Sequence, residues 1–264
     1  MNSPVAVVTG ASGGIGKGVA SLLSGYGYTV YDLSRSGKDG DGIRHITCDM
    51  SSAPDVSEAM SRIAEEAGHI DLLINNAGMG VSGAAEFTAF DNAKYIFDVN
   101  FFGPVAAAQS VIPVMRAAGG GRIINISSVA AHVPIPFQSY YSASKSALYS
   151  FSLALRSELI PFGIDVTCIL PGDIATGFTA SRRKDHDGDD LYSGRIGRSV
   201  AVMERDEQSG ISAGYAAKKI ALIALKKNTK PAYVVGLKYK FFVILVKLLP
   251  RSVSNRIVGL LYAR

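Results

Sequence analysis

Short runs of apolar, often β-branched residues alternate along this chain with longer stretches that have the composition of helices. Seven of these runs predict strands, at Val5–Val8, Thr29–Leu33, Ile43–Thr47, Asp71–Ile74, Arg122–Ile126, Asp165–Ile169 and Tyr233–Val235. Most intervening segments are long enough for crossover helices, and strands that are apolar on both faces are typical of a parallel sheet buried between two helical layers. The pattern predicts an α/β fold, a doubly wound sheet of seven parallel strands, formed as a single domain over residues 1–264.

The segment from Ile174 to Gly214 interrupts this alternation, because it is polar, contains glycines and carries a charged stretch at residues 182–190. A loop of this length is usually functional or mobile. In an open α/β sheet it would lie near the carboxyl ends of the strands, where ligands bind. We therefore predict a flexible substrate lobe over residues 178–214.

The last segment, residues 236–264, combines apolar runs with basic side chains, at Lys238, Lys240, Lys247, Arg251, Arg256 and Arg264. Pro250 should end one helix there and let a second begin near residues 252–254. The apolar run at residues 241–246 is far shorter than the roughly 20 residues needed to span a bilayer. Two interpretations remain open. The segment docks on an anionic membrane surface or an apolar partner, or it packs on the domain and roofs the substrate cleft with its lysines pointing outward.

The net charge of +5 hides a division along the chain. Residues 208–264 contain eleven Lys and Arg and no Asp or Glu, whereas the first 207 residues contain 16 basic and 22 acidic side chains, a net charge of −6. Such a split indicates an interaction surface at one end of the protein. No nucleic-acid-binding motif accompanies the basic excess, so we expect no nucleic-acid partner.

The two cysteines, Cys48 and Cys168, lie in or beside apolar strand-like runs, and we expect both to be buried thiols. Two cysteines are too few for a disulfide framework or a zinc cage, and the four histidines show no ligand-like spacing, so we predict no metal site. No basic region precedes the first strand at Val5, which argues against a signal peptide. We expect a cytoplasmic protein, with peripheral membrane association as the alternative that the C-terminal segment leaves open.

A glycine-rich turn, Thr9–Gly16, joins the first predicted strand to a helix. Glycines permit a tight turn and let the backbone approach a pyrophosphate closely, and the helix N-terminus supplies free N–H groups and a positive partial charge. The spacing is G-x-x-x-G-x-G and differs from the G-x-G-x-x-G form. A purely structural turn would also explain the glycines, but the position between strand and helix favours dinucleotide binding.

Further motifs follow in order: Asn75–Gly78 after the fourth strand, Asn100 in the next helix, Ser128, then Tyr141-x-x-x-Lys145, and Pro171-Gly172 after the sixth strand. Together with the glycine-rich turn they resemble the short-chain dehydrogenase/reductase family over about residues 5 to 176, two-thirds of the chain. The resemblance implies a Rossmann-like fold and an oxidoreductase that moves a hydride between a nicotinamide and an alcohol or ketone. It also implies a homo-oligomer, since the family is often dimeric or tetrameric.

The resemblance further implies which residues contact the cofactor. Asp49 matches the family's adenine-contacting acid, and the backbone near Ile174 with the Thr176 hydroxyl would hold the carboxamide of the nicotinamide. The full implied set is Gly10, Ser12, Gly14, Ile15, Gly16, Ser34, Arg35, Asp49, Met50, Asn76, Ala77, Gly78, Tyr141, Lys145, Pro171, Gly172, Ile174 and Thr176.

The end of the second strand bears on the choice between NADP and NAD. An acid there would bind the ribose 2′-hydroxyl of NAD, and an arginine would accommodate the 2′-phosphate of NADP. By the family's spacing Ser34 holds the discriminating position and Arg35 follows it, and a guanidinium can bind a phosphate bidentately. Asp32, on the same strand face as Ser34, is the competing candidate. Gly13 stands at the family's other basic position, so our expectation of NADP(H) over NAD(H) rests on Arg35.

Tyr141 and Lys145 are four residues apart in a helical stretch and therefore share one face. An unperturbed tyrosine has a pKa near 10, and a neighbouring ammonium together with a nicotinamide cation should lower that pKa. The resemblance assigns Lys145 to the ribose hydroxyls, Ser128 to a hydrogen bond with the reacting oxygen, and Asn100 to a water in a proton relay. Family spacing selects Ser128 over its neighbour Ser127, and it leaves Tyr140 as a packing residue.

The expected substrate wall comprises residues 133–137 and the lobe. The visible residues of this wall are apolar, so we expect a hydrophobic alcohol or ketone, such as a sterol, retinoid or acyl lipid, over a sugar. Two other functions use the same fold, a non-catalytic NADP-binding regulator and an isomerase or dehydratase. The intact set of Asn100, Ser128, Tyr141 and Lys145 argues against the regulator.

Overall fold

The computed structural model describes residues 3–263, so Arg264 of the basic C-terminal segment lies outside the described residues. Within that range the main sheet has seven strands in the order β11-β7-β6-β4-β1-β2-β3, and every neighbouring pair is parallel. The predicted doubly wound α/β fold is confirmed. Its strands are β1 Val5–Thr9, β2 Thr29–Ser34, β3 Ile43–Thr47, β4 Leu72–Asn75, β6 Gly121–Ile126, β7 Ile164–Pro171 and β11 Ala232–Val235.

The bounds of β3 are those predicted, and those of the other six strands differ from the predicted ones by one or two residues. The difference at β4 has a clear cause, because this strand includes a polar residue, Asn75, which is buried. The Asn75 side-chain amide donates to the Asn125 side-chain oxygen at 2.8 Å and to the Pro104 carbonyl at 3.2 Å. A buried amide with partners can occupy an interior strand position, which an apolar pattern cannot show.

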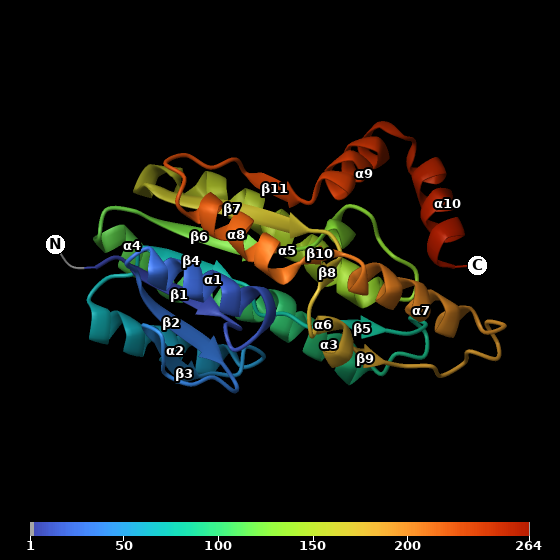
Figure 1. Cartoon of the computed structure of the whole chain (residues 1–264), viewed down its shortest axis with the longest axis horizontal. Coiled ribbons are helices and arrows are strands. Elements are labelled where there is room, and N and C mark those ends of the chain that lie inside the picture. Colours follow the sequence, from blue (N-terminus) through green and yellow to red (C-terminus); the bar gives the residue numbers. More distant parts are fainter. Residues whose placement is uncertain (1–2, 264) are drawn as a thin grey trace.

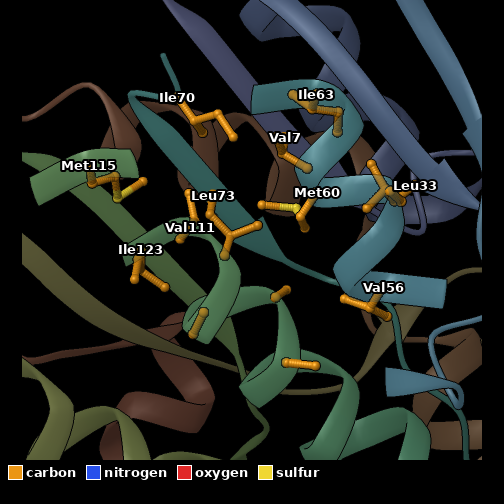
Figure 2. Close-up of a cluster of buried hydrophobic side chains, with 14 of the residues drawn as sticks. Val7, Leu33, Val56, Met60, Ile63, Ile70, Leu73, Val111, Met115 and Ile123 are labelled. Carbon is orange, nitrogen blue, oxygen red and sulfur yellow. The ribbon is translucent and has the colours of Figure 1, made fainter. Parts of the chain in front are cut away.

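Helices cover both faces of the sheet (Figure 1). One layer holds α1 Gly14–Gly25 and α8 Ala213–Ala224, and the other holds α2 Ala53–Ala67, α4 Gly103–Ala117 and α5 Ser139–Leu159. Each layer forms its own apolar core with one face of the strands. Figure 2 shows the core on the side of α2, α4 and α5, which contains Met60 and Ile63 of α2, Leu73 of β4 and Met115 of α4. Cys48 and Cys168 are buried free thiols, as predicted.

Residues 174–214 are not the single long loop that their polarity predicts. They contain β8 Ile174–Ala175, α6 Phe178–Ser181, β9 Arg183–Lys184, α7 Arg195–Gln208 and β10 Ile211–Ser212. The largest of these elements, α7, buries only a narrow stripe, Ile196, Ser199, Val200 and Met203, and its arginines Arg195, Arg198 and Arg205 are exposed. That stripe is too sparse to stand out in a polar sequence. Strand β8 pairs with β10, and β9 pairs with β5 Val81–Ser82, which lies just before α3 Phe90–Phe97.

The C-terminal segment forms two helices, α9 Leu237–Leu248 and α10 Arg251–Tyr262, with Pro250 between them as predicted. They form a hairpin that stands next to α7 at one end of the molecule (Figure 1). Val243 of α9 and Val258 of α10 are buried in a small cluster with Val129 and Val133. In the described part of the chain, no helix has the length and apolarity that crossing a bilayer requires.

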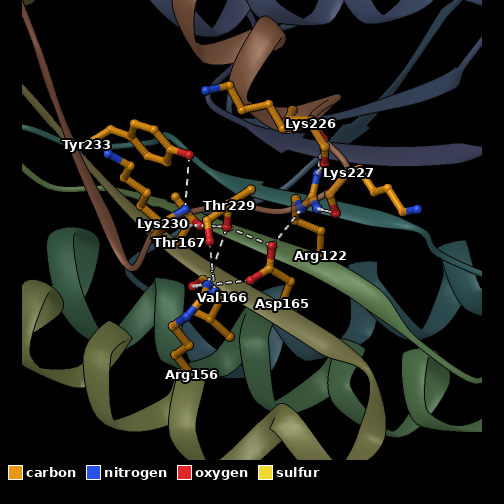
Figure 3. A network of polar contacts seen from close by, with 11 residues as sticks. Arg122, Arg156, Asp165, Val166, Thr167, Lys226, Lys227, Thr229, Lys230 and Tyr233 are labelled. Carbon is orange, nitrogen blue, oxygen red and sulfur yellow. Dashed lines mark hydrogen bonds and ion pairs between the residues drawn. The ribbon is translucent and has the colours of Figure 1, made fainter.

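A polar network joins the amino-terminal ends of β6 and β7 to the turn after α8 (Figure 3). The Asp165 carboxylate accepts from Arg122 Nε at 3.2 Å, from the Thr229 hydroxyl at 2.7 Å and from an Arg156 Nη atom. Arg156 also donates to the Thr229 carbonyl at 2.9 Å. One carboxylate thus neutralises two arginines that are mostly buried.

Asp165→Ala should lower the free energy of unfolding by about 2–3 kcal/mol, because it leaves two largely buried guanidinium groups without their carboxylate. Urea unfolding monitored by circular dichroism would measure the loss. The matched variant Asp55→Ala removes an exposed carboxylate that accepts a hydrogen bond from Ser52 and should change stability much less. Equal stability of the two variants would contradict the role of the network.

Candidate active site

The carboxyl ends of the central strands open into one cavity of about 1030 Å³. Of the residues implied by the family motifs, all line this cavity except Gly16 and Asn100. The lobe contributes Phe178, Arg183, Met203, Asp206 and Glu207, and the C-terminal hairpin contributes Tyr239, Phe241, Phe242, Leu261 and Tyr262. A cavity of this size lies at the upper end of the range for small-molecule and cofactor sites.

The glycine-rich turn forms a cradle of bare backbone. Gly10 has φ +69°, and a Cβ on it would lie 3.0 Å from the Ala77 Cα. Both the backbone conformation and the closeness of Ala77 therefore require glycine at this position. A Cβ on Gly16 would overlap the Gly10 carbonyl, so Gly16 packs behind the turn and does not line the cavity. Helix α1 begins at Gly14 without a capping side chain, which leaves its N–H groups for an anion. These features fit the pyrophosphate of a dinucleotide.

Thr9, which the sequence analysis did not single out, fixes the turn against β4. Its hydroxyl oxygen accepts from the backbone N–H groups of Asn76 and Ala77, both at 3.0 Å. The Asn76 side-chain amide donates back to the Thr9 carbonyl at 3.0 Å and to the Gly10 carbonyl at 3.3 Å. The two loops that flank the cofactor cradle are therefore held as one unit.

At the adenosine end of the cavity, the two candidates for recognition of the ribose, Asp32 and Arg35, lie in different surroundings. Asp32 is buried and does not line the cavity; it accepts from the Ala11 N–H and the Ser34 hydroxyl, both at 2.8 Å, and lies 3.1 Å from His45 Nδ1. Arg35 is exposed, lines the cavity and donates to the Tyr95 hydroxyl at 3.3 Å.

A second arginine, which the sequence analysis missed, also lies at the adenosine end. The guanidinium carbon of Arg183 lies 4.4 Å from the centre of the Tyr95 ring, and Arg183 lines the same cavity. Arg183 comes from β9, far along the chain in the lobe, so only the folded structure brings it beside Arg35.

Asn100 lies in a π-helical turn, Asp98–Phe102, between α3 and α4. Its buried side chain accepts from the Met79 N–H at 2.9 Å and donates to the Met79 carbonyl at 3.0 Å and the Ser144 hydroxyl at 3.1 Å. A Cβ on Gly78 would lie 3.2 Å from both the Asn100 side-chain oxygen and Lys145 Nζ. Asn100 therefore anchors the loop behind the cavity wall, and its relay role stays a prediction.

Helix α5 places Tyr141 and Lys145 in its first two turns. Lys145 is buried, its Nζ donates to the Ile126 carbonyl at 3.0 Å, and burial lowers its pKa to about 8. Ser128 hydrogen-bonds the Tyr141 phenol and also accepts from the Ala130 N–H at 3.1 Å. The neighbouring Ser127 hydroxyl instead donates to the Lys145 carbonyl at 2.7 Å, which makes it part of the support of α5.

Burial raises the pKa of Tyr141 to about 12, and the hydrogen bond from Ser128 opposes this rise. Among the protein's own groups, Ser128 and Arg182 lower this pKa, whereas Lys145, whose Nζ is directed to the Ile126 carbonyl, is not one of its causes. The lowering expected from Lys145 together with a nicotinamide cation stays a prediction. The Tyr141 phenol is therefore protonated at neutral pH, which is the state that donates a proton to a carbonyl oxygen. A positively charged nicotinamide close by would favour the phenolate.

The nicotinamide-side loop is backed by the C-terminal hairpin. A Cβ on Gly172 would overlap the ring of Tyr239, so this ring lies directly against the loop backbone. The Tyr239 hydroxyl donates to Asp173 at 2.8 Å, and the Tyr262 hydroxyl donates to Asp206 of α7 at 3.3 Å. The hairpin is thus a wall of the site.

The substrate wall differs from the predicted one. Val133 and Ile135 line the cavity, but Phe137 packs in a separate cluster with Ala84 and Ile196. The backbone of Phe137 has a positive φ of +60°. Apolar side chains of the lobe and the hairpin take its place. The wall combines these apolar side chains with charged ones such as Asp206 and Glu207, and most of it comes from later in the chain.

The family model described as short chain dehydrogenase matches residues 4–187. The chain belongs to the short-chain dehydrogenase family. This short-chain dehydrogenase is 38% identical over 231 residues to a protein of Bacteroides thetaiotaomicron named 3-ketodihydrosphingosine reductase, with 86% of each chain covered. Among solved structures, a short-chain dehydrogenase from Streptomyces avermitilis superposes with a TM-score of 0.85 at 27% identity, covering 98% of this chain and 96% of that one.

A further solved structure bears on the cofactor. The 3-ketoacyl-(acyl-carrier-protein) reductase of Brucella melitensis, in complex with NADH, superposes with a TM-score of 0.73 at 25% identity, over 88% of this chain and 96% of that one. The short-chain dehydrogenase described here is accordingly an oxidoreductase with a nicotinamide-binding fold. Among residues 3–263, no group of His, Cys, Asp or Glu has the arrangement of a metal site.

Ser128→Ala should lower kcat about 10²–10³-fold, because it removes a donor aimed at the charge that develops on the reacting oxygen. Ser127→Ala is the matched control: it removes a hydroxyl one residue away whose partner is a helix carbonyl. We expect it to lower stability and to leave kcat of the folded enzyme within a few-fold. Steady-state kinetics of both variants at saturating cofactor would decide, and the reverse order of losses would assign the catalytic hydroxyl to Ser127.

Proposed function

We propose that this enzyme uses NADP(H) to interconvert a hydrophobic ketone and the corresponding secondary alcohol, and that its substrate is a long-chain lipid. The observation that carries the proposal is a single cavity in which Ser128, Tyr141 and Lys145 meet an apolar wall. The cradle at the turn after β1 fits the cofactor at the other end of the same cavity.

A nicotinamide held by the cradle would supply the hydride that a carbonyl carbon accepts in the reductive direction. Tyr141 donates its phenolic proton to the carbonyl oxygen, so that the ketone becomes an alcohol. Ser128 hydrogen-bonds the same oxygen and stabilises its developing charge. Lys145 lies beside Gly78 and lines the same cavity, which supports the ribose-binding role that the family motif implies.

The preference for NADP rests on the contacts at the end of β2. Asp32 already accepts two hydrogen bonds inside the protein and faces away from the cavity, so it is poorly placed to bind a ribose hydroxyl. Arg35 and Arg183 both border Tyr95 and both line the cavity. Two exposed guanidinium groups at this position suit a 2′-phosphate.

Arg35→Ala should weaken NADPH binding about ten- to a hundred-fold and NADH binding far less, because it removes a charge-assisted contact to the phosphate. Arg183→Ala should act in the same direction. Arg44→Ala, an exposed arginine on β3 that pairs with Glu66, is the control and should change neither affinity. Dissociation constants from nicotinamide fluorescence would test this. An equal loss for NADPH and NADH would show that Arg35 does not bind the 2′-phosphate.

The cavity favours an amphiphilic substrate. Phe178, Met203, Phe242 and Leu261 give it an apolar wall, whereas the carboxylates of Asp173 and Asp206 line it as well; Glu207 also lines it but is paired with Arg182. A long-chain ketone with a cationic group near the carbonyl would use both features. The name of the relative from Bacteroides thetaiotaomicron, 3-ketodihydrosphingosine reductase, refers to a substrate of this kind.

Purified enzyme with NADPH should reduce a long-chain 3-keto amine faster than a short ketone or a sugar, followed by nicotinamide absorbance. Tyr141→Phe should lower kcat by about 10²–10⁴-fold, the contribution of a positioned proton donor, while NADPH still binds. Tyr140→Phe is the control, because the Tyr140 hydroxyl donates to the Ala85 carbonyl outside the cavity. Product without net oxidation of NADPH would replace the proposal with an isomerase or dehydratase.

A further inference from the structure

Helix α9 is apolar on two opposite faces. Its inner face, Tyr239, Phe242, Val243 and Val246, packs against the domain. Its outer face repeats every three or four residues and consists of exposed side chains at Leu237, Phe241, Ile244, Leu245 and Leu248. A helix that is hydrophobic all round is normally buried, so the outer face lacks a partner within the described residues of this chain.

Helix α10 continues this outer surface. Val258 and Tyr262 pack inward, whereas Val253, Ile257, Leu260 and Leu261 are exposed and again recur at three- or four-residue spacing. The two helices are adjacent in the chain, and Figure 1 shows them as a hairpin that stands out from the rest of the molecule. Together the nine exposed residues of the two helices form what we call the outer apolar surface. Isolated exposed apolar residues are ordinary, but a contiguous patch marks an interaction site.

Positive charge borders the outer apolar surface. On α9, Lys240 and Lys247 are seven residues apart and exposed on one side of the apolar stripe, while Lys238 lies on the other side. Arg251 and Arg256 add two exposed cations on α10. The sequence from Gln208 to the last residue contains no Asp or Glu. An apolar stripe flanked by long basic side chains is the arrangement of helices that lie in the interface of an anionic membrane.

The outer apolar surface is continuous with the cavity. Phe241 is 70% exposed and Leu261 is 54% exposed, and both also line the cavity that holds Tyr141. An apolar molecule could therefore move from the hairpin surface to the catalytic groups along side chains of α9 and α10.

We propose that the α9–α10 hairpin docks on an anionic lipid bilayer, and that a lipid substrate enters the cavity from the membrane past Phe241 and Leu261. The entry of a lipid substrate rests on the proposed function, whereas the docking of the hairpin does not. A second copy of this chain is a poorer occupant, because a symmetric contact would bring the same uncompensated lysines and arginines together. Charge complementarity selects a surface rich in anionic headgroups.

The decisive variant is Leu237→Glu combined with Leu248→Glu. These side chains are 83% and 79% exposed and do not line the cavity, so folding and catalysis on a soluble ketone should be preserved. The matched control is Phe90→Glu combined with Leu191→Glu, at positions 71% and 74% exposed elsewhere on the protein, with the same charge change. We expect the first pair to weaken binding to phosphatidylcholine–phosphatidylserine vesicles at least about tenfold in co-sedimentation, and the control pair to bind like wild type.

A second pair of variants tests the charge. Lys240→Gln with Lys247→Gln should weaken binding to phosphatidylserine-containing vesicles about thirtyfold, since each lysine near an anionic surface contributes about fivefold. Lys218→Gln with Lys219→Gln changes the net charge equally on exposed positions of α8 and should have a much smaller effect. Binding of the wild type should also fall as salt rises.

The readouts separate docking from catalysis. Reduction of the lipid ketone in detergent micelles without any vesicle binding at low salt would overturn docking and leave the proposed function standing. Vesicle binding without turnover of any ketone would overturn the proposed function and leave docking standing. If Leu237→Glu with Leu248→Glu instead disrupts a dimer seen by analytical ultracentrifugation, and vesicles are not bound, the surface is a contact between copies and the membrane proposal is wrong.

Discussion

The active site depends on one buried cation. Lys145 Nζ is held at 3.0 Å from the Ile126 carbonyl, in surroundings that lower its pKa to about 8. A buried ammonium is tolerated only where acceptors are fixed around it, so the end of β6 and the start of α5 must keep one relative position. Ser127 secures this position from behind by donating to the Lys145 carbonyl. The absence of a side chain at Gly78 lets the ammonium and Asn100 approach the loop after β4. Lys145 therefore links the packing of α5 against β6 to the chemistry of the site.

The parts of this site that could be predicted from sequence are those fixed by local geometry. The turn at Thr9–Gly16 needs glycines wherever it occurs, and the four-residue spacing of Tyr141 and Lys145 places them on one helical face in any context. Strand positions followed from apolar runs, apart from the ends where buried amides such as Asn75 continue the strand. Each of these inferences depends on residues that are close together in the chain, so contacts between distant segments do not alter it.

The parts that escaped prediction depend on contacts between distant segments. Arg183 reaches the adenosine end only because β9 pairs with β5, and Tyr239 reaches the nicotinamide loop only because α9 follows β11 and lies against Gly172. The direction of the Tyr141 pKa among the protein's own groups is another such feature, because burial dominates it and the spacing of Tyr141 and Lys145 does not reveal burial. The helix α7 was missed because only three apolar side chains, Ile196, Val200 and Met203, are buried along it. Such features require the tertiary structure.

The division of charge along the chain acquires a physical meaning from the position of the hairpin. The first 207 residues carry a net charge of −6 and form most of the body, whereas the acid-free remainder supplies α8, β11, α9 and α10. An anionic surface would repel the body and attract the hairpin, so long-range electrostatics would turn the hairpin toward the membrane before any apolar contact forms. Because Phe241 and Leu261 border the cavity, that orientation also turns the cavity mouth toward the lipid. On the proposed docking, orientation and substrate access therefore follow from the same two helices, and the catalytic groups need not move to meet the substrate.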